Sequence, residues 1–582
     1  MSLHWTPGRQ AVHLSAHESL YHHTQTEHAM TCMQKQRRSN RDQVRQTGEY
    51  IKVCKNQLLE SVRGPQPDLA LQSFYGDILF LCSQPGASID PSHLNAIIGA
   101  TAKSWTPACA RLGQQEQQQA RHEVHAFLTK MMQRLQPLLP DVGAREAANL
   151  LWSSAKLGLN PDALVPGMTD SLARHFMGDM DAATGQGFAN VLVACAQLQL
   201  SPCQGGLFKA ILNRLVTADL SKFDPQNVAN TLHSLVTIPA VAPSVEVLDA
   251  LCQRLGVQLK SRQVTELPDA QSIANTMWAL SKLKHAPSDE LAMSMVGRMV
   301  ALCRVPGQQP TAQAISNVLL AFAQLRLPVK QADTDNLASF FLSSKRRWIN
   351  VLDALCQRFG VLLNSRPAAE LPVAQSIANT LWALSKLKHA PSDQLAMSMV
   401  GRMVALCCVP GQQPTPQAIS NVLLACAELS VPVKQADTDS LASFLLSSNK
   451  RQGTQQAYAN TAWSLAVIGH LRQAQFMLLL DQMFALSGSP GEMSTPPLLT
   501  AAQLTQLYQA QDWLQPHPTA PAQQLHRLGP RPAPDKPPFF GIHKLCAALN
   551  QLQLSFKAMG GQHHMHHAMG GEILSSDAGC TT

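Results

Sequence analysis

Apolar and polar residues recur along most of this chain with the period of an amphipathic α-helix. In the segment QSIANTLWALSKL (375–387), apolar side chains recur three and four residues apart and leave a polar stripe between them. The segment is followed by a turn at Ala390-Pro391 and then by a second apolar-periodic segment. SDELAMSMVGRMVALC (288–303) is a segment of this second kind. The pattern predicts pairs of helices joined by short turns.

Start signals for the first helix of each pair support this prediction. Asp224-Pro225, Thr311 and Thr415-Pro416 each stand directly before an apolar-periodic segment. Asp and Thr side chains cap free backbone N–H groups, and proline is well accommodated at the first helical position. The Pro- and Gly-rich segment 305–311 is typical of a loop between pairs.

The helix pairs belong to a repeat. Residues 248–344 recur almost letter for letter as residues 352–448, at an offset of 104 (352 − 248). Beneath this duplication, a Q-x-x-[A/S]-N pattern recurs every ~40 residues, a spacing typical of helix-pair repeats. Its Asn residues stand at positions 190, 230, 275, 317, 379, 421 and 460. We therefore expect an all-α solenoid of αα-hairpins, which can lengthen by duplication without disturbing a single core.

Five regions follow from the pattern. We expect residues 1–66 to form a disordered basic and His-rich region, with features of a degraded transit peptide, and residues 67–140 to form a degenerate helical N-terminal cap. Residues 141–486 would hold about eight repeats. A helical C-terminal cap would occupy 487–515, and a largely disordered Pro-, His- and Gly-rich tail would occupy 516–582.

The polar stripe of the first helices supplies the candidate binding residues. With the Gln numbered i, the Asn lies at i+4, Trp or another residue at i+7, and Lys, Gln or Glu at i+11, which places all four on one face of the helix. The small residue at i+3 lies beside the stripe, where neighbouring helices approach closely. The candidate RNA-binding residues are Gln186, Asn190, Gln197, Gln226, Asn230, Gln271, Asn275, Lys282, Gln313, Asn317, Gln324, Gln375, Asn379, Lys386, Gln417, Asn421, Gln456 and Asn460.

Two interpretations of this stripe stay open. In the first, the amides face a ligand: Asn and Gln offer donor and acceptor to base edges, Lys contacts phosphate, and Trp stacks on a base. In the second, the Asn residues form a buried ladder that bonds the loop of the adjacent repeat, and the Trp belongs to the core. The second interpretation suits i+4 and i+7 better. The first suits positions i and i+11, because their residues vary between similar repeats.

The composition and the motifs that are absent limit the classes of function that the sequence supports. Charged residues make up 14% of the chain and the formal net charge is +8, which suits an anionic partner without requiring one. No apolar run approaches the ~20 residues of a membrane helix. No phosphate-binding loop, nucleophile elbow or zinc-protease motif is present. The 14 cysteines include no C-x-x-C pair and are expected to be buried thiols. We predict neither an enzyme nor a cofactor or metal site.

Two weaker features remain. The HHMHH cluster (His563, His564, His566 and His567) could bind a soft metal ion but lies in the predicted tail. Lys345-Arg346-Arg347 lies at the duplication junction, with Lys450-Arg451 at the equivalent place in the copy. We expect both basic groups to lie in loops, where they would contact phosphate or simply remain solvated.

The string Q-x-x-A-N-x-x-W-A-L-x-K-L at 271–283 and 375–387 resembles the octotricopeptide-type repeats of green-algal organelle RNA factors. It is also similar to the leucine-rich region of FAST-kinase-like mitochondrial RNA regulators. Residues 149–159 and 460–470 fit the same pattern, and LTQLYQAQDWLQ (504–515) resembles the segment that follows the last repeats in that group. The RAP module with which many such proteins end is not found here.

The resemblance implies a sequence-selective organelle RNA-binding protein. Its partners would be single-stranded mRNA, rRNA or intron RNA and other RNA-processing proteins, with no membrane and no small-molecule substrate. It would act in processing, stability, splicing or translation, in the chloroplast stroma or alternatively in the mitochondrial matrix. The alternative from the residues alone is an armadillo- or HEAT-like protein scaffold, since one architecture serves both uses. The near-identical copies also fit a duplicated or truncated gene product with impaired function.

Overall fold

In a computed structural model, the described residues form α-helices, short 3₁₀-helices and connecting turns, without any strand. This confirms the predicted all-α fold. The described residues are 40–84, 87–200, 206–217, 219–238, 242–261, 263, 267–326, 338–365, 371–447, 453–485 and 499–514. None of their helices combines the length and hydropathy of a membrane span.

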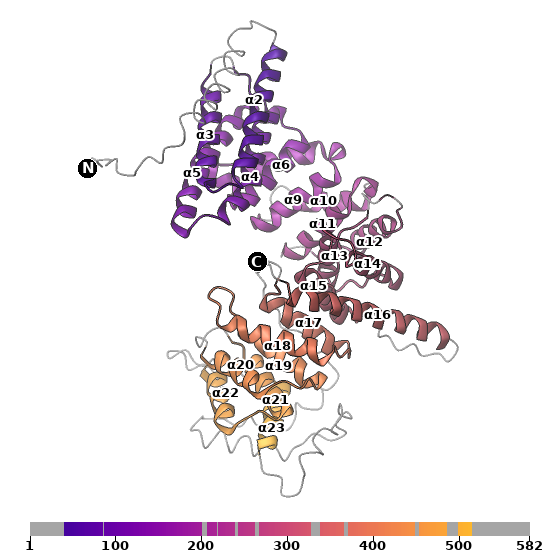
Figure 1. Cartoon of the computed structure of the whole chain (residues 1–582). Helices are drawn as coiled ribbons and strands as arrows, with labels where there is room; N and C mark the ends of the chain where they lie inside the picture. The colour runs from indigo at the N-terminus through magenta and orange to yellow at the C-terminus, as the bar shows by residue number, and fades with distance from the viewer. Residues whose placement is uncertain are drawn as a thin grey trace, which may run out of the picture. The chain divides into compact units, whose positions relative to one another are not determined.

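The chain divides into two compact units, the first containing α2 to α16 and the second α17 to α23. In each unit, successive first helices contact one another and successive second helices follow beside them. Figure 1 shows the helices of each unit in this chain order. The helical repeat character predicted from the sequence is therefore present in both units.

The first helices of the first unit begin with α2 (Asn40–Ser61) and end with α15. Between them stand α4 (Pro91–Cys109), α6 (Ala144–Leu157), α9 (Gly185–Gln197), α11 (Pro225–Thr237) and α13 (Ala270–Lys282), and α15 spans Ala312–Leu325. The second helices are α3 (Pro67–Ser83), α5 (Gln114–Leu135), α8 (Met168–Gly178), α10 (Leu207–Thr217), α12 (Val245–Leu259), α14 (Asp289–Leu302) and α16 (Ala338–Leu363). The short elements α7 (Pro161–Leu164), η1 (Gln136–Asp141), η2 (Met180–Ala182) and η4 (Leu220–Lys222) lie in the connections.

The second unit continues the same alternation. Its first helices are α17 (Ala374–Lys386), α19 (Pro416–Leu429) and α21 (Gln455–Ile468), and α23 (Ala501–Leu514) lies against α21 in the place of a further first helix. Its second helices are α18 (Asp393–Cys407), α20 (Gln435–Ser447) and α22 (Gln473–Ala485).

Small residues at i+3 allow the first helices to pack closely. Ala189, Ala274 and Ala378 are at most 1% exposed, and Ser316 and Ser420 are equally buried at the same position. The neighbouring apolar positions, such as Ile273 and Met277, are completely buried. This confirms the predicted packing face, and it leaves the Gln–Asn stripe on the opposite side of the helix.

Three first helices, α11, α15 and α19, begin at the predicted cap residues. The side chains of Asp224, Thr311 and Thr415 each accept a hydrogen bond from the backbone N–H three residues later. Asp269 does the same for α13, with 2.7 Å between Asp269 Oδ1 and the Ser272 nitrogen. Val373 takes this position in α17 and has no side chain able to cap.

In several helix pairs, an arginine on the second helix donates a hydrogen bond to the backbone just before the first helix of the same pair. Arg254, Arg298 and Arg358 donate through Nε to the backbone oxygens of Phe223, Pro268 and Pro310 at 2.9, 3.2 and 3.5 Å. Arg402 reaches the Pro372 oxygen in the same way at 3.5 Å. Each acceptor directly precedes the N-cap residue, so the bond sets the angle at which the chain enters the first helix. This contact was not predicted from the sequence.

The N-terminal boundary predicted from the sequence is wrong for residues 40–66. Helix α2 occupies most of this segment and packs on α3 and α4, so the ordered region begins before residue 67. Its buried side chains Ile51, Cys54 and Leu58, together with Val62 directly after its end, recur three or four residues apart. Long polar side chains between them hid this stripe from composition. Residues 1–39 and the tail from 516, including the HHMHH cluster, lie outside the described residues.

The duplication junction is a helix and not the expected loop. Helix α16 runs without interruption through Lys345-Arg346-Arg347 and joins the end of one copy to the start of the next. Its C-terminal part pairs with α15: Trp348 packs edge-on against Phe322 at 4.9 Å between ring centroids, and Arg358 bonds the Pro310 oxygen. The junction therefore contains two second-helix sequences with no first helix between them. Lys450-Arg451 lies outside the described residues.

Candidate functional site

The Gln–Asn stripe of the first helices reaches the surface. At position i, Gln186, Gln226, Gln271, Gln313 and Gln375 are exposed, whereas Gln417 and Gln456 are half-buried. At i+4, Asn230, Asn275, Asn317, Asn379 and Asn421 are half-buried, whereas Asn190 and Asn460 are buried. At i+11, Gln197, Lys282 and Lys386 are exposed and Gln324 is half-buried. The tertiary structure thus places the predicted residues in one surface row in each unit.

The amides of one helix bond to each other. The Nε2 of Gln271 donates to Asn275 Oδ1 at 2.8 Å, and Gln375 donates to Asn379 at the same distance. Equivalent bonds join Gln417 to Asn421 at 2.9 Å and Gln456 to Asn460 at 2.7 Å. In α13 and α17, the Asn Nδ2 and Gln Oε1 atoms have no partner among the described residues. Each of these pairs therefore presents a fixed donor and a fixed acceptor to solvent.

The predicted Asn ladder is confined to the ends of the row. In the first unit, Asn190 Nδ2 donates to Asn149 Oδ1 of the preceding repeat at 3.0 Å. In the second unit, Gln506 Nε2 of α23 donates to Asn460 Oδ1 at 2.8 Å. Asn275, Asn379 and Asn421 accept from the Gln of their own helix. A ladder to the loop of the adjacent repeat therefore does not describe these middle repeats.

Aromatic side chains at i+7 border the amides. His233 of α11 stacks on Trp278 of α13, with 4.9 Å between ring centroids and 27° between ring planes. Burial lowers the pKa of His233 below its usual 6.5, so the stacked ring is neutral at physiological pH. Trp382 has the Lys386 ammonium 5.9 Å from its ring centroid, and Trp463 donates to Gln509 Oε1 at 2.8 Å. These half-buried rings serve both packing and a surface contact.

Cations cluster at the C-terminal ends of the first helices. Lys282 is followed by exposed Lys284, and Lys386 by exposed Lys388. Lys284, Arg326 and Lys388 adopt the left-handed conformation (φ 54°, 52° and 54°), where α6 and α21 use Gly158 and Gly469. A side chain at this position costs about 1 kcal/mol relative to glycine. Lys284, Lys388 and Arg326 were not among the predicted residues, although their place just after the i+11 residue was a usable signal.

The second unit differs in its charge pairing. Lys386 Nζ lies 2.8 Å from Glu428 Oε1 of the next first helix, and Glu428 is the i+11 residue there. In the first unit, the corresponding pair is Lys282 and the uncharged Gln324. Lys282 has no ion-pair partner among the described residues. Equivalent lysines of the two copies therefore present different charge to solvent.

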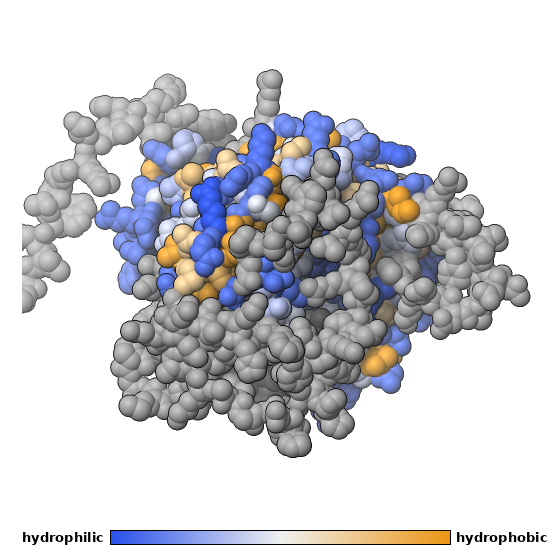
Figure 2. All heavy atoms as spheres, turned by 90° about the horizontal axis from the view of Figure 1, so that it is seen from below, coloured by the Kyte–Doolittle hydropathy of each residue, from blue (hydrophilic) through white to orange (hydrophobic). Residues whose placement is uncertain are grey.

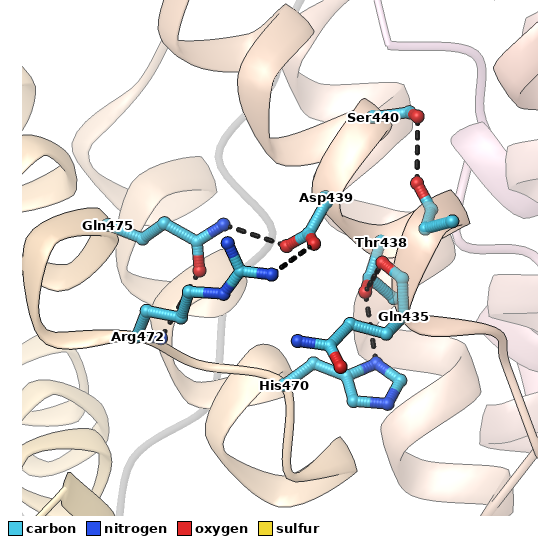
Figure 3. Close-up of polar contacts among 8 residues, drawn as sticks. Gln435, Thr438, Asp439, Ser440, His470, Arg472 and Gln475 are labelled. Carbon is cyan, nitrogen blue, oxygen red and sulfur yellow. Dashed lines mark hydrogen bonds and ion pairs between the residues drawn. The ribbon is translucent and has the colours of Figure 1, made fainter.

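Away from the stripe, polar contacts fasten the second helices of the second unit. Figure 3 shows Asp439 of α20 accepting from Arg472 at 2.7 Å and from Gln475 at 3.0 Å. His470 Nδ1 lies 3.0 Å from the Thr438 hydroxyl. These bonds tie α20 to the turn between α21 and α22 and to the first turn of α22, and we assign them to packing.

The cysteines and acidic residues of the described region form no site of their own. Burial raises the pKa of the Cys252 and Cys356 thiols, which are equivalent in the two copies, to about 12. Both thiols are therefore protonated at neutral pH and unreactive as nucleophiles. Within the described residues, no three His, Cys, Asp or Glu side chains are placed to hold a metal ion.

Comparison with known proteins does not assign the chain to a family. No family model matches the chain, and no curated protein is significantly similar to it.

Proposed function

We propose that this protein binds single-stranded RNA sequence-selectively through the exposed face of its first helices. The observation that carries the proposal is the row of bonded Gln–Asn pairs in α13, α17, α19 and α21, with free donor and acceptor atoms in α13 and α17. Modular RNA-binding repeats read bases with two or three side chains per helical repeat. Lysines beside the amides supply charge for the phosphates, and the net charge of +8 favours an anionic partner.

Different positions along each first helix would contact different parts of a nucleotide. The Gln–Asn pair near the N-terminal end would contact a base edge, and the half-buried i+7 ring would support the base by stacking. The lysines at and after i+11 would contact the backbone. Neighbouring helix axes separated by about 8–10 Å would bring successive bases to successive repeats.

The biological setting is part of the proposal. We propose an organelle RNA factor of the chloroplast stroma, or alternatively of the mitochondrial matrix, that acts in RNA processing, stability, splicing or translation. This rests on the octotricopeptide-type resemblance of 271–283 and 375–387 and on the basic cluster near the N-terminus. RNA held along the first helices would be protected from nucleases or kept unpaired.

The test is selection from a randomised single-stranded RNA pool by the full chain, followed by fluorescence anisotropy on the selected RNA. Lys282→Ala with Lys284→Ala should weaken binding of all sequences by a similar factor and reduce the salt dependence. Gln271→Ala with Asn275→Ala should instead change which sequence is preferred. Lys209→Ala removes one exposed lysine from second helix α10. It is the charge-matched control for the single variant Lys282→Ala and should leave binding unchanged.

Two results would contradict the proposal. Absence of RNA binding at low salt by the folded chain would remove RNA as the ligand. An equal loss of binding in the Lys209 variant would show that general positive charge, and not the first-helix face, is responsible.

One observation favours a protein scaffold as the second candidate. The second helices expose apolar residues at matching positions of the two copies: Val245 and Ile349 are 60% and 42% exposed, and Val257 and Val361 are 58% and 56% exposed. Figure 2 shows that hydrophobic residues are interspersed among hydrophilic ones on the coloured part of the surface in that view. A partner protein on the second-helix face would leave the first helices unoccupied, and substituting Val257 and Val361 with Ser would abolish its binding.

A further inference from the structure

The two copies have diverged in charge in one direction at the C-terminal ends of their first helices. Lys282 and Lys284 are retained as Lys386 and Lys388, but Gln324 of the first copy is replaced by Glu428. The adjacent Arg326 is replaced by Ser430, and both residues keep the left-handed conformation (φ 52° and 56°). The face of the second copy has thus gained one negative charge and lost one positive charge.

Elsewhere in the two copies, one positive and one negative charge have been lost together. The first copy has an ion pair between Lys260 of the α12 C-cap and Glu290 of α14, 3.0 Å apart. Both partners are uncharged in the second copy, where Asn364 and Gln394 replace them. Loss of both partners of an exposed pair has little effect on charge or stability. The change on the first-helix face has no such balance.

The geometry shows what the gained charge does. Glu428 Oε1 lies 2.8 Å from Lys386 Nζ, and the Glu428 side chain is 19% exposed against 37% for Lys386. Glu428 Oε2 is buried and has no hydrogen-bond partner among the described residues. The carboxylate therefore faces Lys386 and offsets its charge at close range, whereas Gln324 leaves Lys282 uncompensated.

We infer that Glu428 weakens backbone binding at the second copy by neutralising Lys386. This rests on the proposed function. Lys282, Lys284 and Arg326 hold the phosphodiesters of the RNA at α13 and α15, whereas Lys386 is neutralised and contributes little. The amide pairs of α17 and α19 remain free to contact bases. Glu428 is thus a specificity-determining residue that fixes where the strand is anchored.

Because equivalent positions of the two copies carry different residues, exchanging these residues gives matched variants that can be tested in the full chain. The probe is a labelled single-stranded oligoribonucleotide selected by the wild-type protein, measured over a range of salt concentrations. Glu428→Gln should tighten binding about two- to fivefold at low salt. It should also steepen the slope of log affinity against log salt by about 0.7, the value for one more phosphate contact on a single strand. The reciprocal Gln324→Glu should weaken binding and flatten the slope.

A double-mutant cycle separates charge pairing from folding. Lys386→Ala should cost more affinity in the Glu428→Gln background than in the wild type. In the wild type it removes only a paired lysine and leaves the Glu428 carboxylate uncompensated, whereas in the Glu428→Gln background it removes a lysine that is free to contact phosphate. Lys282→Ala should cost affinity in both. Circular dichroism of each variant establishes that the helical fold is retained.

The outcomes distinguish the two proposals. If the wild-type chain binds RNA but Glu428→Gln changes neither affinity nor salt slope, the inference about Glu428 is wrong and the proposed function stands. If the folded wild-type chain binds no RNA, the proposed function is wrong, and the inference fails with it.

Discussion

At the residue scale, the i+7 position shows how one side chain serves two neighbouring repeats. His233 and Trp278 are stacked across the contact between α11 and α13. The lowered pKa of His233 means that the unfolded chain binds a proton more readily than the folded chain. Acidification therefore favours unfolding at this contact.

The pH dependence of stability tests this contact. Stability should be greatest above the usual histidine pKa of 6.5, fall as the pH decreases below it, and level off below the folded-state pKa. His233→Phe keeps an aromatic ring on Trp278 and removes the proton site. Between pH 7.5 and 5.5 the melting temperature of this variant should fall less than that of the wild type. Identical pH dependence in both proteins would contradict our assignment of a neutral, buried His233.

At the element scale, the duplication provides pairs of equivalent helices that differ at only a few positions. Helices α13 and α17 have the same sequence except at the N-cap and at Met277, which is Leu381 in the copy. Asp269 caps α13 with a 2.7 Å bond to the Ser272 nitrogen, and Val373 caps α17 without a side-chain bond. The second copy has therefore lost a local helix signal while keeping the helix, which shows that packing against its neighbours maintains α17.

Restoring the cap should stabilise α17. Val373→Asp should increase its stability by about 1 kcal/mol, the usual value of an N-cap hydrogen bond. Hydrogen exchange measured by mass spectrometry should show slower exchange in α17, and the Met277 and Leu381 difference identifies peptides from each copy. Asp269→Val in α13 is the reciprocal change and should speed exchange there. Unchanged exchange in both variants would mean that the caps contribute nothing beyond packing.

At the scale of the whole molecule, a solenoid must cover the end of each stack. In the second unit, α23 lies on α21 with Leu507 and Ala510 buried, and Gln506 and Gln509 bond Asn460 and Trp463 of α21. In the first unit, α2 lies on α4 in the corresponding place. These helices shield apolar surface that an unpaired repeat would expose.

Removal of α23 should destabilise the repeat beneath it. A chain ending at residue 498 should lose hydrogen-exchange protection in α21 and α22, while α17 and α18 change less, because repeat stability depends on nearest neighbours. A chain ending at residue 514 retains α23 and is the control. Equal protection of α21 in both truncated chains would show that α23 does not act as a cap.

How much of this structure was predictable depends on the distance over which each signal acts. Helices α14 and α17 were predicted from patterns between residues within one helix turn of each other. Their bounds lie within one residue of the expected segments. The burial of Ala274 and Ala378 at i+3 followed from the same wheel. The N-terminal helix α2 was missed because polar residues outnumber its apolar stripe, and the junction in α16 was missed because neither copy contains a helix that long.

The sequence by itself determined the repeat, the helix pairs and the polar stripe, because caps, turns and the 3.6-residue period act between residues close in the chain. Only the tertiary structure decided that the stripe lies at the surface, that Arg298 bonds the Pro268 oxygen, and that Glu428 pairs with Lys386. The two contacts join residues 30 and 42 positions apart in the chain. Their geometry depends on how neighbouring helices pack, and no pattern within a single helix specifies it.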